Sequence, residues 1–400
     1  MDASQHPHPL AGKLVEVVGA IYGLPQSNKI FEDGLKIALE QIGFLPAHMP
    51  GTHVTTAPDQ CVFQLYDTDH PAVQATLVFH VDDCDALSFN APTITRLRTH
   101  LEKRYGPLAW TDVSPQFTGS MITHYPNGAV GFDMSKHINK LLKSSGADKL
   151  PAAFTPCDRT LFDPSTDTTP SDLTAYQRLV GALTFISRDR HDITKMVHVH
   201  ARAAKAPTKG DLDKVIRTLR YLKGTPSLPA VYYTEEGPVL YGHVDTSFAN
   251  QTSDGTSLTA VHLTIGATSA PFLSKCHKQT TVALSPCSSE YIGFTPCLQQ
   301  VMRFRQLLAA VGFPQAGPTT VFADNQPAID ITTAPSIPRK SRHHNVEHHY
   351  SRELVANGDV VFVHKNTHEL TPDLNTKNHP AAIHHYLTHL TMNTESIPPV

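Results

Sequence analysis

The stretch VLYGHVDTSFA (239–249) predicts a β-strand with an acid, Asp245, inside it. Two more strand-like runs follow, SLTAVHLTIG (257–266) and APFLSKCH (270–277). A long helix with apolar periodicity then begins near SSEYIGF (288–294). The order of these segments predicts three consecutive strands followed by a helix.

Helices and strands alternate in the rest of this half. The predicted elements are the strand TTVFAD (319–324), the helix NQPAIDI (325–331), the helix VEHHYSRELVANG (346–358), the strand DVVFVH (359–364) and a short C-terminal helix. Three strands followed by such an alternation is the order of an RNase H-like domain. We therefore expect residues 236–377 to form an RNase H-like α/β domain with a five-stranded mixed sheet, followed by a frayed tail (378–400).

Acidic residues stand at the edges of four of these elements. They are Asp245, Glu290, Asp324 and Asp373. Folding could bring them to one end of the sheet, where they would hold two divalent cations about 3.5 to 4 Å apart for phosphodiester cleavage. For any one of these acids taken alone, a helix cap or a surface position is the simpler interpretation.

Two neighbouring carboxylates, Asp82 and Asp83, follow an apolar run in FHVDDCDAL (79–87). Adjacent acids repel unless water or a cation screens them, and successive side chains of a regular strand point to opposite faces. The flanking runs predict two strands joined by a tight hairpin, which could present both carboxylates to a metal ion. A solvated turn is the alternative, because Asp is an ordinary turn residue.

The first half otherwise alternates helices with hairpins. Helices are predicted at 29–44 and 91–106, and a second hairpin is predicted at 116–134. These segments indicate an α+β unit, to which we assign residues 1–158.

An aperiodic stretch rich in Pro, Ser, Thr and Asp (157–172) separates this unit from a helical region, residues 159–235. Two helices are predicted there, at 174–187 and 209–224. The second carries Lys214 and Arg217 on one face, which could follow a phosphate backbone. A solvated surface face is the alternative interpretation.

Composition limits the classes of protein and partner. The formal net charge of -3 gives no global attraction to nucleic acid, so such binding would need local basic patches. No apolar stretch approaches the roughly 20 residues needed to cross a bilayer, and the N-terminus has no signal-peptide pattern, so we expect an intracellular protein that is not secreted. The six cysteines form no CxxC pair, and the 25 histidines leave a zinc-binding regulator as the last-ranked alternative.

Ordered strings along nearly the whole sequence resemble the polyprotein of copia-type LTR retrotransposons, from the reverse-transcriptase palm through the thumb to RNase H. FHVDD (79–83) resembles the polymerase YVDD box, with His80 in place of Tyr. The other strings are AIYGLPQS (20–27), DQCVF (59–63), YQRLVGALTFISRDRHDI (176–193), RTLRYLKGT (217–225), VALSPCSSEYIG (282–293), ADNQPAI (323–329), KSRHHNVEHHYSRE (340–353) and PDLNTK (372–377).

For the polymerase half, the resemblance implies that Asp82 and Asp83 belong to the catalytic turn and bind magnesium. Tyr22, Gly23 and Gln26 would belong to the nucleotide and nucleic-acid site. The family's third carboxylate lies upstream of the YGL motif, and no string here resembles its strand. We therefore expect an N-terminally truncated polyprotein that does not polymerise DNA alone, and whose missing segments are possible partners.

For the RNase H half, the resemblance implies a complete set of acids. Asp245, Glu290, Asp324 and Asp373 match the family's metal-binding positions, and His343 matches its retained histidine. The departures, Ser288, Asn345 and Asn375, remove none of the four acids. The implied cofactor is Mg²⁺ or Mn²⁺, and the implied substrate is the RNA strand of an RNA:DNA hybrid.

These observations lead to one expectation and one rival. We expect an α+β chain with a partial palm, a helical thumb and an RNase H-like domain, acting in a cytoplasmic particle or the nucleus. The rival is a non-catalytic relic or domesticated module that binds nucleic acid without cleaving it.

Overall fold

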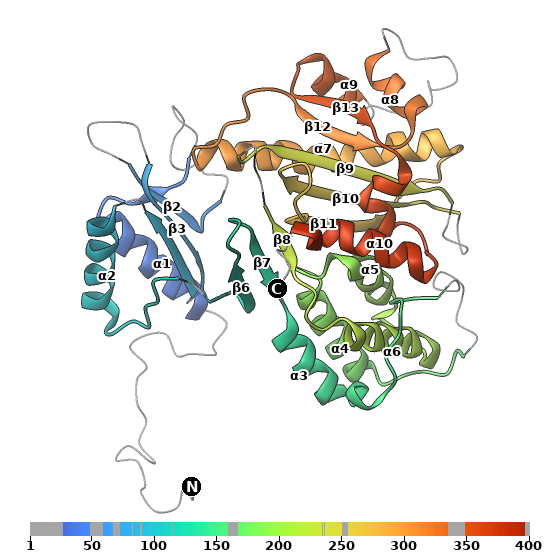
Figure 1. Cartoon of the computed structure of the whole chain (residues 1–400), viewed down its shortest axis with the longest axis horizontal. Helices are drawn as coiled ribbons and strands as arrows, with labels where there is room; N and C mark the ends of the chain where they lie inside the picture. The colour runs from blue at the N-terminus through green and yellow to red at the C-terminus, as the bar shows by residue number, and fades with distance from the viewer. Residues whose placement is uncertain are drawn as a thin grey trace, which may run out of the picture. The chain divides into compact units, whose positions relative to one another are not determined.

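The computed structural model describes most of the chain, which forms two compact units, Met1–Asp112 and Val113–Val400 (Figure 1). The described residues are 27–48, 59–66, 73–81, 83–88, 90–113, 115–158, 167–233, 235, 237–249, 255–334 and 349–396. Their mixed helix and strand content agrees with the expected class. Within these ranges, no helix combines the length and the apolar character needed to cross a bilayer.

The first unit contains an antiparallel sheet in the order β1-β2-β3-β4. Its core forms where Leu39 and Leu97, from the two helices, pack with Phe63 and Phe79 of the sheet. The two predicted helices are therefore confirmed. The elements are α1 (Ser27–Glu40), β1 (Leu45–Pro46), β2 (Val62–Tyr66), β3 (Val73–His80), β4 (Asp83–Ser88) and α2 (Ala91–Tyr105).

The FHVDD segment forms the predicted tight hairpin. His80 pairs with Asp83, so only two residues connect β3 to β4. The first of them, Val81, has a φ of 55°. Two-residue hairpin turns require positive φ at this position, but a β-branched residue adopts it at a steric cost. Asp82 lies outside the described residues.

The second unit begins with a small antiparallel sheet, ordered β5-β6-β7-β8, and a group of helices. Helix α6 starts at a capping box in which Thr208 and Asp211 satisfy each other's backbone N–H groups. The hairpin predicted at 116–134 and both predicted helices are confirmed. The elements are β5 (Gln116–Phe117), β6 (Ser120–His124), β7 (Val130–Asp133), α3 (Ser135–Ser145), η2 (Ala147–Lys149), α4 (Leu173–Ile186), η3 (His191–Ile193), α5 (Thr194–Ala203), α6 (Lys209–Gly224) and β8 (Ala230–Tyr232).

A buried ion pair joins η3 to α6. The Arg190 guanidinium donates to both carboxylate oxygens of Asp192 at 2.9 and 2.7 Å, and the Tyr221 hydroxyl donates to the same carboxylate at 2.6 Å. Arg190 also donates to the carbonyl oxygen of Thr225 at 2.6 Å. Each of these bonds is needed, because a buried charge without a partner is strongly destabilising.

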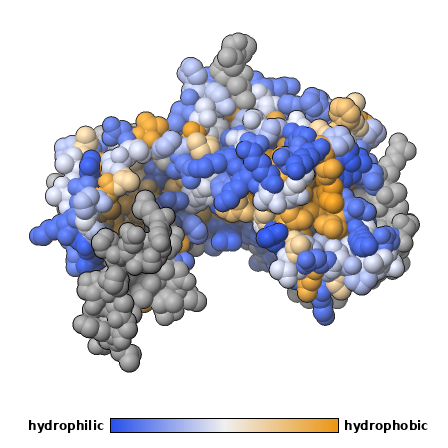
Figure 2. Space-filling view, turned by 90° about the horizontal axis from the view of Figure 1, so that it is seen from below, coloured by the Kyte–Doolittle hydropathy of each residue, from blue (hydrophilic) through white to orange (hydrophobic). Residues whose placement is uncertain are grey.

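The surface on the side of α3, α4 and α6 mixes hydrophilic and apolar side chains, as Figure 2 shows from below. Leu141, Leu179 and Phe185 help to line a hollow of about 280 Å³ at α3 and α4. Because this surface is not uniformly basic, phosphate contacts by α6 would depend on individual side chains.

A five-stranded mixed sheet forms the rest of the second unit, in the order β11-β10-β9-β12-β13. The β11, β10 and β9 strands pair antiparallel, whereas β9, β12 and β13 pair parallel. The predicted five-stranded mixed sheet is therefore confirmed. The strands are β9 (Leu240–Ser247), β10 (Leu258–Ile265), β11 (Leu273–Lys278), β12 (Thr319–Ala323) and β13 (Val360–His364).

One long helix, α7 (Pro286–Ala310), packs along this sheet (Figure 1). Phe294 and Leu298 of α7 join Leu240 and Val244 of β9 in the largest buried apolar cluster. Asp245 follows Val244, so its side chain points to the opposite face of the sheet. The remaining elements are α8 (Gln326–Thr333), α9 (His349–Ala356), η6 (Thr367–Glu369), η7 (Thr371–Asn375), α10 (Ala381–Met392) and η8 (Thr394–Ser396).

The prediction of a frayed tail at 378–400 is wrong for the residues of α10. Leu387 and Met392 are buried, and Met392 packs with Ala230 of β8 and Ala270. Asn393 then donates to the carbonyl oxygen of Val231 at 3.1 Å. The segment is ordered because burial of its apolar face offsets the entropy lost on fixing the backbone.

Replacing Asp192 with Asn should lower the free energy of unfolding of the second unit by about 3–5 kcal/mol, because Arg190 would be left buried without an anion. Chemical denaturation would measure this change. Asp158→Asn is the matched control, since it removes an exposed partner 4.0 Å from Arg217 and should cost less than about 1 kcal/mol. Equal losses in the two variants would contradict the assignment.

Buried histidines should make the second unit sensitive to mild acid. Burial lowers the pKa of His200 to about 3 and the pKa values of His191 and His384 to about 4. The unfolded chain binds these protons near pH 6.5 and the folded chain does not, so stability falls as the pH drops from about 6.5 towards 4. The expected slope is up to about 1.4 kcal/mol per pH unit for each histidine.

Denaturant unfolding at a series of pH values would test this. The variant His200→Gln should flatten the pH dependence, whereas the exposed control His124→Gln should leave it unchanged. A slope that is identical in both variants would show that His200 does not contribute.

Candidate metal site

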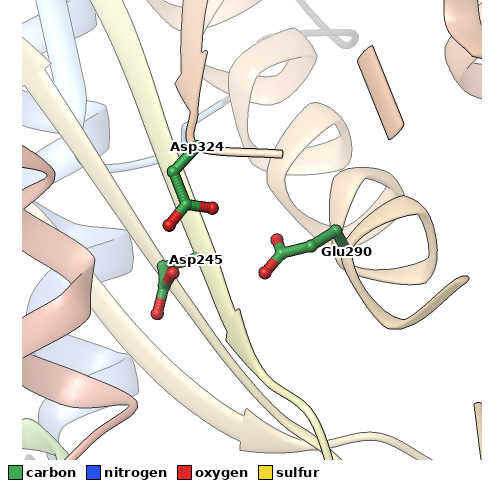
Figure 3. A group of neighbouring side chains, drawn as sticks. All are labelled: Asp245, Glu290 and Asp324. Atoms are coloured by element: carbon green, nitrogen blue, oxygen red, sulfur yellow. The ribbon is translucent and has the colours of Figure 1, made fainter. Parts of the chain in front are cut away.

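Three carboxylates from three different elements meet at one end of the five-stranded sheet (Figure 3). Asp245 lies on β9, Glu290 lies in the second turn of α7, and Asp324 directly follows β12. Each contributes one oxygen to a group whose atoms all lie within 4.8 Å of one another. Figure 3 shows the Glu290 side chain extending from its helix towards the two aspartates.

The fold brings these residues together for two local reasons. Because β9 and β12 run parallel, Asp245 and Asp324 both lie towards the carboxyl ends of adjacent strands. Gly293 allows the helix to approach, since a Cβ atom there would lie 2.5 Å from the Thr246 hydroxyl. A larger residue at 293 would push α7 and Glu290 away from Asp245.

Neighbouring groups fix one oxygen of each carboxylate. Glu290 accepts a hydrogen bond from the Thr246 backbone N–H at 3.1 Å, and Asp324 accepts one from the Thr367 hydroxyl at 2.7 Å. Asp245 accepts one from the Thr376 hydroxyl. The second oxygens of Asp245 and Glu290, Oδ1 and Oε2, are buried and accept no hydrogen bond.

Burial and the neighbouring negative charges disfavour the charged forms of Asp245 and Glu290. Burial, opposed by Lys377 and reinforced by Asp373 and Asp324, raises the pKa of Asp245 to about 6. Burial and the charges of Asp245 and Asp324 raise the pKa of Glu290 well above its usual range. A cation at the centre would relieve both effects.

The donor set fits a hard divalent ion. Carboxylate oxygens suit Mg²⁺ and Mn²⁺ better than Zn²⁺, which favours nitrogen and sulfur ligands. Oxygens that share one Mg²⁺ at about 2.0–2.1 Å are at most about 4.2 Å apart, so a separation of up to 4.8 Å needs only a small contraction. The atoms available for it are Glu290 Oε2, which accepts no hydrogen bond, and Asp245 Oδ1, which has only the ion pair with Lys377 at 3.6 Å.

Asp373, the fourth expected ligand, is not a member of this three-carboxylate group. It lies in η7, where Lys377 pairs with its Oδ1 atom and the His379 ring lies 3.1 Å from its Oδ2 atom. Burial alone would raise the pKa of Asp373, but the hydrogen bond from His379 and the charge of Lys377 outweigh burial and lower it. Asp373 is therefore held as an anion by side chains of its own segment.

Sequence reasoning did not single out Lys377, Thr376 or His379. The first two belong to the PDLNTK string, so the signal was present, but only the acid in it was assigned a role. The departure Asn375 is fully buried and donates to the carbonyl oxygen of His191 and to the His262 ring, both at 3.0 Å. It connects η7 to the helical region and to β10.

The structure does not test the roles expected for the remaining residues. Asp83 is exposed at the start of β4, whereas Asp82, Tyr22, Gly23, Gln26 and His343 lie outside the described residues. On α6, Arg217 donates to the Thr155 hydroxyl at 3.1 Å, and both Lys214 and Arg217 are half-buried. Their contacts with nucleic acid stay predictions.

Comparison with known proteins found relatives along most of the chain. It is 23% identical over 358 residues to the "Retrovirus-related Pol polyprotein from transposon RE2" of Arabidopsis thaliana, covering 90% of this chain and 24% of that protein. The corresponding polyprotein from transposon RE1 of the same plant is 24% identical over 362 residues, covering 90% of this chain and 23% of the relative. The polyprotein from transposon TNT 1-94 of Nicotiana tabacum is 25% identical over 337 residues, covering 82% of this chain and 25% of that protein.

No family model matches the chain. The chain spans about a quarter of the length of these curated relatives. The similarity nevertheless extends through both compact units, and the relatives share one description. The resemblance expected from the sequence is confirmed: the chain is a relative of the retrovirus-related Pol polyproteins of transposons.

Proposed function

We propose that residues 236–377 form a nuclease domain of the RNase H type, which cleaves the RNA strand of an RNA:DNA hybrid with the help of a divalent metal ion. The observation that carries this proposal is the meeting of Asp245, Glu290 and Asp324 within 4.8 Å. These residues come from a strand, a helix and a strand end that are far apart in the sequence. Acidic residues scattered over a surface would not have to come together from distant segments in this way.

The order of the strands supports the same proposal. The first three strands of the region form antiparallel neighbours, and the next two add in parallel beside the first strand, as β11-β10-β9-β12-β13. The strand that carries Asp245 is therefore central. The acids therefore lie at the end of the central strand. Ligands of open α/β sheets bind at such strand ends, so a phosphate of a nucleic-acid strand could bind there.

Each acid has a defined part in this proposal. Asp245, Glu290 and Asp324 would hold the ion, which when bound lowers the pKa of water and stabilises charge on the phosphate. Thr246, Thr367 and Thr376 orient the three carboxylates through one hydrogen bond each. His343 is proposed, from its sequence position alone, to assist protonation or product release.

For the first unit we propose no independent polymerase activity. The related catalytic turn works with a third carboxylate, and the printed sequence contains no string that resembles the strand carrying it. Within the described residues, which exclude Asp82, Asp83 belongs to no group of three potential metal ligands.

Asp245→Asn should reduce cleavage of a labelled RNA:DNA hybrid by at least about a thousandfold, because it replaces an anionic ligand with a neutral one of equal size. Excess chelator should abolish cleavage by the unmodified chain. Asp330→Asn, a change of an exposed acid on α8, is the matched control and should retain full activity.

The opposite result has a clear meaning. If purified chain binds the hybrid but never cleaves it with Mg²⁺ or Mn²⁺, the proposal is wrong and the chain is a non-catalytic binding module. Cleavage that survives Asp245→Asn would place the activity elsewhere or in a contaminant.

Primer extension on an RNA template should remain at background with either Mg²⁺ or Mn²⁺. The measurement is incorporation of labelled nucleotide by the purified chain, with a known reverse transcriptase as the positive control. Template-dependent extension that disappears in Asp83→Asn would contradict the proposal for the first unit.

A further inference from the structure

The side chain of Gln279 links strand β10 to the start of helix α7. Gln279 directly follows β11, is only 4% exposed, and donates its backbone N–H to the carbonyl oxygen of Ser257 at 2.8 Å. Its Nε2 atom donates to the Thr259 hydroxyl at 3.0 Å and to the carbonyl oxygen of Ser289 at 2.9 Å. Because Ser289 immediately precedes Glu290, Gln279 holds α7 at the residue next to a member of the three-carboxylate group.

Two further contacts connect Gln279 to Glu290 from the side of the sheet. The Thr259 hydroxyl lies 3.3 Å from the Thr246 hydroxyl, and the Thr246 backbone N–H donates to Glu290 Oε1 at 3.1 Å. Together with the bond to Ser289, these contacts close a ring. The Glu290 side chain is therefore held both from its own helix and from strands β9 and β10.

The orientation of the Gln279 amide follows from its partners. A carbonyl oxygen can only accept, so the group that faces Ser289 is the NH₂ group, whose two hydrogens serve the two acceptors. The Oε1 atom is then buried and accepts no hydrogen bond from the described residues, which is destabilising. A buried acceptor without a donor calls for an explanation beyond stability.

We infer that Gln279 is a positioning residue, which fixes Glu290 at the three-carboxylate group and thereby sets the affinity of that group for a divalent ion. It acts through Glu290 and is not itself a ligand. Loss of a group that orients a metal ligand typically weakens metal binding about 10- to 100-fold. The effect on affinity rests on the proposed metal-dependent function, whereas the positioning of Glu290 can be measured without a metal.

Amide hydrogen exchange of the metal-free chain measures the positioning directly, because the Thr246 N–H is protected by its bond to Glu290 Oε1. The variant Gln279→Met has a side chain of nearly the same length that cannot donate. It should raise the exchange rate of the Thr246 amide at least about tenfold relative to the amide of Val244 in the same strand.

Gln315→Met is the matched control, since Gln315 accepts from the Leu240 backbone N–H at 2.8 Å at the other end of β9. This variant should raise exchange at Leu240 and leave exchange at Thr246 unchanged. In calorimetry, the affinity for Mn²⁺ should fall about 10- to 100-fold in Gln279→Met and stay unchanged in Gln315→Met.

A folded Gln279→Met chain in which either the exchange of Thr246 or the affinity for Mn²⁺ is unchanged would overturn the inference. Equal changes in Gln315→Met would do the same, because they would show a general loss of stability. If Gln279→Met does not fold, as judged by circular dichroism, Thr259→Val removes the neighbouring hydroxyl at nearly constant size. Unchanged exchange at Thr246 in that variant would also overturn the inference.

The two measurements separate this inference from the proposed function. If the unmodified chain binds no Mn²⁺, the proposed function and the effect on affinity are wrong, whereas faster exchange of Thr246 in Gln279→Met would still support the positioning of Glu290. If the chain binds Mn²⁺ and cleaves the hybrid, but Gln279→Met leaves Thr246 exchange unchanged, the proposed function stands and the role of Gln279 is wrong.

Discussion

The repulsion between three neighbouring carboxylates, of which Asp245 and Glu290 are buried, is the constraint on which the second unit depends. Asp245, Glu290 and Asp324 bring like charges within 4.8 Å of one another at a point where burial weakens screening by water. Packing must hold them there against that repulsion. The close approach of α7 to β9 at Gly293 and the parallel pairing of β9 with β12 supply the necessary rigidity. The cost in stability is typical of sites that bind and act on charged groups.

Local signals were enough to predict much of this arrangement. Strand-like runs separated by breaks predicted the five strands. The edge positions of Asp245, Glu290 and Asp324 allowed their meeting, and the family resemblance singled them out as metal-binding acids. The FHVDD hairpin followed from two strand-like runs with no room for a longer loop. The glycine in SSEYIG, Gly293, is visible in the sequence, but its role depends on Thr246, which belongs to strand β9.

Other features depend on partners that are distant in the sequence, and no local pattern indicates them. The pairing of Asp245 with Lys377 joins the two ends of residues 236–377, whereas the sequence had assigned Asp245 and Asp373 the same role as metal ligands. The burial of Arg190 runs against the usual exposure of arginine, and it depends on Tyr221 and Thr225 of a later segment as well as on nearby Asp192. The residues of helix α10 were predicted to be a frayed tail, but Met392 packs with Ala230 and Ala270, which lie far from it in the sequence.

The short η7 segment has a consequence for how such chains can evolve. Asp373 on η7 pairs with Lys377, whose Nζ atom lies 3.6 Å from Asp245. Its neighbour Asn375 donates to the carbonyl oxygen of His191 in the helical region and accepts from the Lys195 backbone N–H at 3.3 Å. If recombination replaced the five-stranded sheet with a sheet from another protein, these buried polar groups would lose their hydrogen-bond partners. Further hydrogen bonds cross the same boundary, from Ser274 to Thr194 and from Lys195 to Asn378, so we expect the helical region and the five-stranded sheet to be inherited together as one module.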